Sequence, residues 1–524
     1  MSFLTIHEAS AFATEFTSKK VTESNISYLI QYGRIDKIEK NGVICVDKNQ
    51  LESYYKSFKG RKEIEWKNIL GDDVNWELSF DGYKEKETTK HVHRLHPYKG
   101  KYIPQLVEYF LDDHVDSFKS EVYFHKGDII LDPFCGSGTT LVQANELGMH
   151  AVGIDISSFN SQISNCKVKK YDYIKLKKAV DFITSKLESY EKTLGIAEFD
   201  EELLEKLYSF NSIYFPSPEF KKRVYKKEIN EKEYGEEKAE MFLPYFEILA
   251  KKHGVSLEVS QTSFLDKWFF ETTRKEIYFV NEIIEGIEDE AIKQLLQIIL
   301  SRTMRSCRAT THSDLATLIM PVYTTYYCVK HKKICKPLFS ILKWWKTYSI
   351  NTLERISEFD KLRTDTMQKC FAEDSSTANI SKCIESMGGS IYETYKKEKI
   401  KGIFCSPPYV GIIDYHEQHA YAYELFGFTR NDNLEIGSMQ KGRNRAAQKK
   451  YVEDISQVLI NCKQYLSDDY EVFIVANDKF GLYETIAKNA GMKIVDTFKR
   501  PVLNRTEKDK NAYSESIFRM KEGV

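Results

Sequence analysis

Long apolar runs are absent from this chain of 524 residues, although hydrophobic residues make up 42% of it. Charged residues interrupt each apolar stretch well short of the roughly 20 residues that a membrane-spanning helix needs. Residues 1–12 also lack the basic segment and cleavage site of a secretory signal. We therefore expect a cytoplasmic protein with no membrane partner.

Cysteine is sparse, and a surplus of positive charge is missing. The ten cysteines stand at uneven spacings, which favours reduced thiols over a disulfide framework. The 76 Lys and Arg residues are balanced by 77 Asp and Glu residues, giving a net charge of −1. This balance excludes a uniformly basic, histone-like protein, so any nucleic acid must bind at a local positive face.

Residues 1–58 have the pattern of a separate small module. Two helical segments precede β-rich runs at 35–40 and 43–46, and Asn41-Gly42 between the runs predicts a hairpin because both positions tolerate positive φ. The order resembles the excisionase-like winged helix-turn-helix, in which the second helix enters the major groove. The alternative is a helical cap that packs on the next domain. The resemblance implies that the second helix presents Ser24, Asn25, Ser27, Tyr28 and Gln31 to DNA.

The rest of the chain alternates between strand and helix patterns. Residues 59–90 have no usable periodicity and are expected to be a linker, whereas 128–154 predict a strand, a helix and a second strand. Strand patterns resume at 400–405 and 472–476 and end in a terminal hairpin over 492–520. These elements predict an α/β fold with a Rossmann-like, doubly wound sheet.

A glycine-rich loop, Asp-Pro-Phe-Cys-Gly-Ser-Gly-Thr-Thr, occupies residues 132–140 between the first strand and its helix. Gly136 and Gly138 allow a tight turn and a close approach of backbone to ligand, and Asp155 after the next strand can accept two ribose hydroxyls. Phosphate-binding loops use similar turns, but their Gly-Lys-Ser/Thr signature is missing here. With Gly153-Ile154-Asp155-Ile156, the loop resembles motifs I and II of amino-methyltransferases, which implies S-adenosylmethionine as the cofactor.

A second loop, Cys-Ser-Pro-Pro-Tyr at 405–409, also follows a predicted buried strand, where doubly wound sheets bind their ligands. The prolines stiffen it and leave their carbonyls free to accept hydrogen bonds. Such a loop suits the methylation of an aromatic amine, which is a poor nucleophile because its lone pair is delocalised into the ring. Acceptors on its two protons, expected from the Ser406 side chain and the Pro407 carbonyl, would localise that pair. Tyr409 would stack on the base, which must first leave the duplex.

This second loop resembles the Asp/Asn/Ser-Pro-Pro-Tyr/Phe signature of N6-adenine and N4-cytosine DNA methyltransferases. The resemblance implies catalytic roles for Ser406, Pro407, Pro408 and Tyr409, and the serine form is typical of cytosine-N4 enzymes. It covers about residues 91–160 and 370–520. Residues 93–104 are similar to motif X of the family, which encloses the methionine part of the cofactor, and 371–375 are similar to motif III. The implied cofactor-binding residues are Tyr102, Asp132, Pro133, Phe134, Cys135, Gly136, Gly138, Thr139, Thr140, Asp155, Ile156 and Asp374.

Several weaker patterns leave two interpretations open. Asp374 either contacts the adenine amine of the cofactor or caps a helix, and residues 310–314 either line the DNA cleft or cap a helix. Residues 414–419 favour a helix beside the substrate pocket over a metal site. Arg443 and Arg445 belong to a basic run that contacts phosphates or is merely solvated.

Residues 167–369 form a long, mostly helical insert and a possible target-recognition region. Six apolar residues between Ile284 and Ile299 fall near one helical face. Cys328, His331 and Cys335 could bind zinc, but a fourth ligand is not evident and the nearest thiol is Cys307, so we predict no metal site.

The sequence therefore predicts five regions: a winged helix-turn-helix at 1–58, a linker at 59–90, the cofactor half of a methyltransferase core at 91–166, the insert at 167–369 and the catalytic half at 370–524. The expected activity is methyl transfer from S-adenosylmethionine to N4 of cytosine in a specific sequence of double-stranded DNA, with a cognate restriction endonuclease as a possible partner. The alternatives are an N6-adenine DNA methyltransferase, an RNA amine methylase and a catalytically silent DNA-binding regulator.

Overall fold

The computed structural model describes residues 3–17, 20–31, 34–40, 42–58, 69–70, 74–75, 77–80, 83, 85–257, 262–315, 318–502 and 513–523. Asn41 of the expected hairpin turn and residues 59–68 of the expected linker lie outside this set. The chain divides into two compact units: Met1–Ile69, Lys186–Tyr278 and Arg305–Leu342 form one, and Leu70–Ser185, Phe279–Met304 and Lys343–Val524 form the other.

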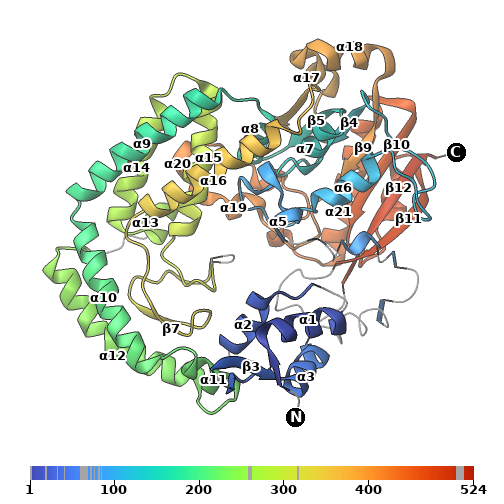
Figure 1. Ribbon diagram of the computed structural model, residues 1–524. Helices are drawn as coiled ribbons and strands as arrows, with labels where there is room; N and C mark the ends of the chain where they lie inside the picture. The colour runs from blue at the N-terminus through green and yellow to red at the C-terminus, as the bar shows by residue number, and fades with distance from the viewer. Residues whose placement is uncertain are drawn as a thin grey trace. The chain divides into compact units, whose positions relative to one another are not determined.

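The second unit is built on a seven-stranded sheet, whose labelled strands can be followed in Figure 1. The strand order is β11-β12-β10-β9-β4-β5-β8, and the five strands from β10 to β8 are parallel. β12 runs antiparallel between β10 and β11. The sheet therefore confirms the predicted α/β fold, including the terminal hairpin. The strands are β4 (Ile129–Asp132), β5 (His150–Asp155), β8 (Gln368–Ala372), β9 (Ile400–Cys405), β10 (Leu466–Ala476), β11 (Met492–Pro501) and β12 (Ser514–Glu522).

Successive strand residues point to opposite sides of the sheet, and β4 and β5 are buried at every position, so both faces are covered by helices. On one face, Leu131, Ile403 and Ile474 share a buried core with α17 (Ile380–Met387), α18 (Gly389–Glu398), α21 (Arg445–Lys463) and α22 (Tyr483–Asn489). On the other face, the Phe110 ring of α6 (Pro104–Leu111) lies 5.0 Å from the Phe473 ring. α7 (Thr139–Glu146) and α8 (Ser158–Val168) contact β5 and β8 on this side.

The remaining short helices of this unit border the sheet and its loops. They are η1 (Glu77–Ser79), α5 (Glu85–Thr88), η2 (His91–Arg94), α19 (Tyr415–Gln418), α20 (Ala420–Phe426), η3 (Asp432–Leu434) and η4 (Met439–Lys441).

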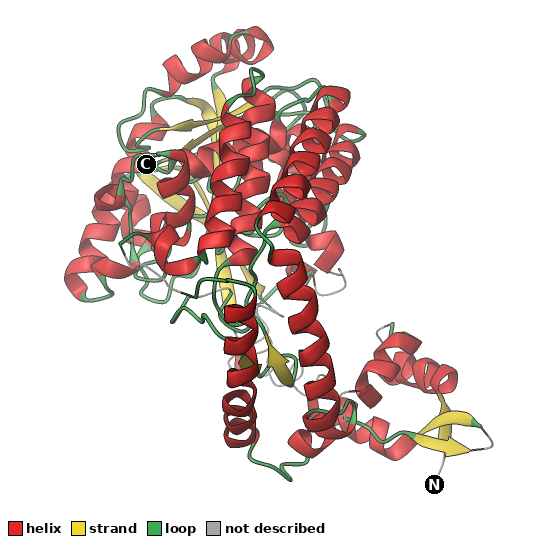
Figure 2. Cartoon of the chain, turned by 90° about the vertical axis from the view of Figure 1, so that its left-hand side faces the viewer, coloured by secondary structure: helices red, strands yellow, loops and turns green. Residues whose placement is uncertain are grey.

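The N-terminal residues of the first unit form a small module whose strands lie at the end marked N in Figure 2. A three-stranded sheet of order β1-β3-β2 pairs β1 (Phe3–Thr5), β3 (Val43–Asp47) and β2 (Ile38–Lys40), with α1 (Ile6–Thr17), α2 (Glu23–Gln31) and α3 (Lys48–Phe58) beside it. α2 begins with a reciprocal cap, because the Asn25 side chain accepts from the Thr22 amide at 2.9 Å while Thr22 Oγ1 accepts from the Asn25 amide at 3.3 Å. The two predicted helical segments and the antiparallel pair of strands that follows them are present.

Residues 167–369 contain several helices and one two-stranded sheet of β6 (Tyr326–Cys328) and β7 (Lys333–Cys335). The six apolar residues from Ile284 to Ile299, which were expected on one helical face, do not share one helix. α14 ends at Glu285 and α15 begins at Glu290. Within the described ranges, every helix is too short or too polar to cross a bilayer. The helices are α9 (Tyr173–Thr193), α10 (Ile196–Tyr214), α11 (Glu219–Tyr225), α12 (Glu231–Lys252), α13 (Phe264–Trp268), α14 (Glu271–Glu285), α15 (Glu290–Cys307) and α16 (Leu342–Asp360).

Candidate active site

The two loops singled out in the sequence emerge side by side. β4 and β9 are parallel neighbours, with Ile130 opposite Gly402 and Leu131 opposite Ile403, so the loops after Asp132 and Cys405 meet at one edge of the sheet. A pocket of about 850 Å³, including space open to solvent, lies at this edge. It is lined by Tyr98, Gly100, Lys101, Tyr102, Pro133, Phe134, Cys135, Gly136, Ser137, Thr139, Asp155, Ile156, Ser157, Asn160, Asp374, Ser375, Ser406, Pro408, Tyr415, Leu434, Glu435, Ile436 and Val458.

Gly136 forms part of the pocket wall at a position where a larger residue would be strained and crowded. Its φ is +50°, a conformation that L side chains rarely adopt. A Cβ at this position would lie 3.0 Å from the Tyr98 hydroxyl oxygen. The Gly136 amide donates to Asp155 Oδ2 at 2.7 Å, which ties the loop to the end of β5. The glycine thus leaves bare backbone facing the pocket.

Asp155 is buried beneath this loop. Its Oδ1 accepts from the Ser157 amide at 2.9 Å and from the Asn160 side chain at 3.1 Å. A carboxylate has about four acceptor positions, and these two bonds and the Gly136 bond use three of them. Burial raises the pKa of Asp155 to about 6, although its hydrogen bonds lower it. Asp155 keeps acceptor capacity and titrates close to neutral pH.

Asp132 and Thr140 lie behind the pocket wall and hold Tyr102, which lines it. The Tyr102 hydroxyl donates to Asp132 Oδ2 at 3.2 Å and is hydrogen-bonded to Thr140. Burial raises the pKa of Asp132 to about 7. Gly138 caps α7 and also does not line the pocket. The other predicted cofactor residues line it, namely Tyr102, Pro133, Phe134, Cys135, Gly136, Thr139, Asp155, Ile156 and Asp374.

Asp374 belongs to the turn after β8, where its Oδ1 accepts from the Ser376 amide at 2.9 Å and the Ser376 hydroxyl at 2.7 Å. The following helix, α17, is capped by Asn379. Asp374 is therefore a turn residue at the pocket and does not cap that helix.

In the second loop, Ser406 and Pro408 line the pocket, Pro407 is buried, and Tyr409 points toward β12. The Tyr409 hydroxyl donates to Glu515 Oε1 at 3.0 Å, and the Ser406 side chain also hydrogen-bonds with Tyr409. Burial and then the Glu515 carboxylate raise the pKa of Tyr409 well above its ordinary value. The Tyr409 proton is thereby committed to Glu515, which leaves its oxygen to accept from Ser406.

Two further wall residues lie in segments that the sequence placed at the pocket, Tyr98 in 93–104 and Tyr415 in 414–419, and the structure adds Glu435. The rings of Tyr98 and Tyr415 stack with centroids 5.8 Å apart. Glu435 is buried, accepts from the His416 amide at 2.7 Å and is hydrogen-bonded to the His416 ring. Glu435 follows η3 outside every motif of the sequence, so no local pattern pointed to it.

The residues predicted to bind DNA lie outside this pocket. On α2, Ser24, Asn25 and Tyr28 are exposed while Ile26 is fully buried. Gln31 ends α2, and its side chain lies outside the described set.

The two predicted arginines lie near the second loop and are both exposed. Arg443 Nε donates to the Gly411 carbonyl at 3.1 Å, just beyond the Pro-Pro-Tyr motif, and Arg445 begins α21.

Comparison with known proteins agrees with this arrangement. Residues 17–165 match a family model described as DNA methylase. The chain is 48% identical over 522 residues to the Type II methyltransferase M.MjaII of Methanocaldococcus jannaschii, covering 99% of this chain and 96% of that protein. Two further Type II methyltransferases, M.MvaI of Kocuria varians and M.BsoBI of Geobacillus stearothermophilus, are each 30% identical over 21% of this chain and over 23% and 20% of their own lengths. The near full-length match shows that the chain belongs to the amino-methylating DNA methyltransferase family.

Proposed function

We propose that the protein transfers a methyl group from S-adenosylmethionine to N4 of a cytosine within a specific sequence of duplex DNA, as the modification enzyme of a restriction-modification system. The observation that supports this most strongly is the shared pocket. Ser406 and Pro408 line the same cavity as the glycine-loop residue Gly136 and the carboxylates of Asp155 and Asp374. A methyl donor and an exocyclic amine could therefore meet in one place.

The pocket residues fit the cofactor that the family uses in general. Gly136 keeps the wall open where a Cβ would meet Tyr98, and Asp155 and Asp374 offer acceptors for hydroxyl and amine protons. We assign Asp155 to a ribose hydroxyl, Asp374 to the adenine amine, and Tyr98, Lys101 and Tyr102 to the methionine portion. When bound, S-adenosylmethionine supplies an electrophilic methyl group on its sulfonium.

Ser406 is positioned to accept a proton of the target amine. Its hydroxyl proton is directed to the Tyr409 oxygen, because the Tyr409 proton goes to Glu515. A serine that donates to Tyr409 has its oxygen lone pairs available on the pocket side. This acceptor and the Pro407 carbonyl would hold the amine so that its lone pair is localised on nitrogen.

The target base must leave the duplex to reach this pocket, which costs a few kcal/mol of unpairing and unstacking. We assign the stacking surface for the extruded base to Tyr409. Cytosine is favoured over adenine because the motif begins with serine. The relatives named Type II methyltransferases support the assignment to a restriction-modification system with a cognate endonuclease.

The decisive experiment incubates the purified protein with methyl-labelled S-adenosylmethionine and unmethylated bacterial DNA, then identifies the labelled nucleoside by mass spectrometry. We expect N4-methylcytosine. N6-methyladenine would keep the chemistry and overturn the base assignment. Label in tRNA alone would move the protein to the RNA amine methylases, and no label in any nucleic acid would favour a silent DNA-binding protein.

A further inference from the structure

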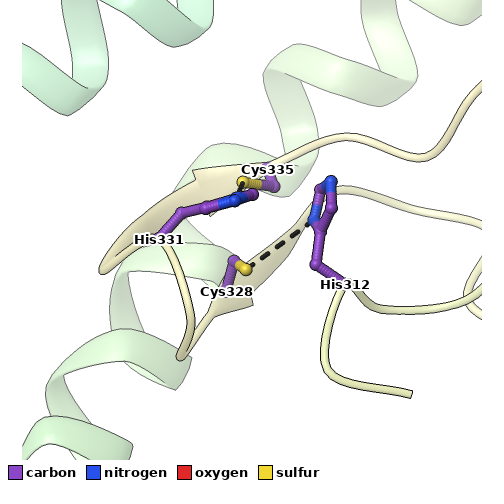
Figure 3. Close-up of side chains that lie close together, drawn as sticks. All are labelled: His312, Cys328, His331 and Cys335. Carbon is purple, nitrogen blue, oxygen red and sulfur yellow. Dashed lines mark hydrogen bonds between the residues drawn. The ribbon is translucent and has the colours of Figure 1, made fainter. Parts of the chain in front are cut away.

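A cluster of four potential metal ligands lies outside the active-site pocket, in the part of the first unit that contains β6 and β7. His312, Cys328, His331 and Cys335 each offer one ligand atom, and these atoms all lie within 4.8 Å of one another. Figure 3 shows the four side chains converging from two strands, the hairpin loop and the preceding coil. The first of them, His312, supplies the fourth ligand that the sequence spacing did not reveal.

The register of the hairpin explains why both thiols face the same way. Tyr326 pairs with Cys335 and Cys328 pairs with Lys333, so these residues occupy one face of the small sheet. Tyr327 and Ile334 alternate to the opposite face, where both belong to the aromatic-rich core that includes α10 and α12 residues. The thiols therefore point away from the helices, toward His312 and His331.

The distances suit a tetrahedral zinc ion. Cys328 Sγ lies 3.7 Å from His312 Nδ1, and Cys335 Sγ lies 3.5 Å from His331 Nδ1. With Zn–S near 2.3 Å and Zn–N near 2.0–2.1 Å, sulfur and nitrogen on one tetrahedral ion are separated by about 3.6 Å. The two imidazole rings approach to 4.4 Å between centroids at an angle of 62°. These two sulfur–nitrogen pairs thus already have the spacing of a coordination shell.

Among the described residues, few apolar contacts stabilise this face of the hairpin. Each strand has three residues, and an isolated two-stranded hairpin is marginally stable. The apolar cluster here contains only Tyr326, Cys328 and Cys335 with Val322 packed against it, as far as the described residues extend. Two of these core members are the thiols themselves. A metal ion would replace the missing core, as in other small folds with few apolar contacts.

We propose that His312, Cys328, His331 and Cys335 bind a structural Zn²⁺ ion. Two thiolates balance the charge of the ion, and four protein ligands leave no open position for catalysis. Thiolate and imidazole ligands in tetrahedral geometry favour zinc over magnesium or calcium, which take oxygen ligands. The ion joins the hairpin to the coil that follows α15.

Tyr326 is the one group that competes for the site in the described structure around it, because its hydroxyl is 2.7 Å from His312 Nδ1. When the metal binds, this hydroxyl must give up that nitrogen and bond to a thiolate or to water. Removing the hydroxyl while keeping all four ligands should therefore preserve or strengthen metal binding.

The test measures metal content of the full-length protein by mass spectrometry after purification and dialysis, and then replaces zinc with Co²⁺. We expect about one zinc per chain, and a cobalt form with strong visible absorption and thiolate-to-cobalt charge transfer, typical of a tetrahedral site with sulfur ligands. A wild-type protein that retains no zinc after zinc supplementation, or whose cobalt spectrum is octahedral, overturns the proposal.

Variants separate the ligand set from general effects on folding. Cys328→Ala and His312→Ala should each lower the retained zinc at least about tenfold, whereas Cys307→Ala, which removes a buried thiol outside the cluster, and Tyr326→Phe should retain it. His331→Cys should keep the metal and intensify the charge-transfer band, because a third thiolate replaces an imidazole. A stronger charge-transfer band cannot result from loss of folding, so this variant tests the ligand set directly. Full zinc content in Cys328→Ala, or equal loss in Cys307→Ala, would contradict the assignment.

Discussion

At Gly136, replacement by alanine should weaken cofactor binding. The left-handed φ costs alanine about 1–2 kcal/mol, and its Cβ would meet the Tyr98 hydroxyl at 3.0 Å. We expect S-adenosylhomocysteine to bind at least about tenfold more weakly, as measured by calorimetry. Gly195→Ala is the matched control, because its φ is +65° but the added Cβ meets nothing within 4 Å. Equal affinities for wild type and Gly136→Ala would remove this loop from the cofactor site.

Asp155 should make cofactor binding depend on pH. Its pKa is raised to about 6 by burial, and only the ionised carboxylate accepts freely from ribose hydroxyls. Affinity should therefore be full above the pKa and should fall, by up to about tenfold per pH unit, as the pH drops below 6. Titrations with S-adenosylhomocysteine between about pH 5 and 7.5 would show this slope. Asp155→Asn should bind weakly with no slope, and an identical slope in that variant would assign the titration to another group.

Tyr409 should show two separable roles. Tyr409→Phe keeps the ring but breaks the hydrogen-bond chain from Ser406 to Glu515, so we expect a lower kcat with little change in DNA affinity. Tyr409→Ala also removes the stacking surface, which is worth about 1–3 kcal/mol per base and predicts a further loss of roughly 10- to 100-fold. Steady-state kinetics with a 2-aminopurine-labelled duplex would measure both turnover and base extrusion. Wild-type turnover in Tyr409→Phe would eliminate the proposed orientation of Ser406.

At the scale of elements, the sequence predicted the parts of the site that lie on contiguous strands and turns. β4, α7, β5 and β9 lie within a residue or two of their expected ranges, because buried strands and glycine turns have strong local patterns. Tyr98 and Tyr415 lie in segments that were expected at the pocket, but Glu435 was not predicted, because it follows η3 outside every motif of the sequence. His312 was not predicted as a zinc ligand, because it lies in a coil 16 residues before Cys328 and outside the Cys-His-Cys spacing.

Helix α2 gives the test of the proposed DNA-binding module. Ile26 is fully buried whereas Tyr28 is 51% exposed, so Tyr28→Ala should leave folding intact. We expect roughly tenfold weaker binding to the cognate duplex, about 1.4 kcal/mol, with cofactor affinity unchanged. Glu15→Ala, an exposed change on α1, serves as the control in the same fluorescence anisotropy assay. Unaltered DNA affinity in Tyr28→Ala would favour the alternative, a helical cap.

For the whole molecule, the near-zero net charge requires DNA affinity to come from a few placed cations. Removing the Arg443 and Arg445 side chains together should reduce the magnitude of the slope of log K against log salt by about 2. It should weaken binding to all duplexes alike. Lys449 and Lys450 are the contrast, because they lie 4.0 Å and 2.7 Å from the carboxylates of Glu453 and Asp454. Their removal should change the slope less. A larger change in slope for the lysine pair than for the arginine pair would instead assign the phosphate contacts to Lys449 and Lys450.

The placement of β4 beside β9 has a consequence for how the protein is made. β4 finds one neighbour, β5, shortly after its own synthesis, but its other neighbour emerges from the ribosome only after the whole stretch from α8 to α18. Until then the nascent chain exposes an unpaired apolar edge, which is a known route to aggregation. Such distant pairing also slows folding. We therefore expect production to depend on chaperone capacity and growth temperature more than the stability of the finished protein would suggest.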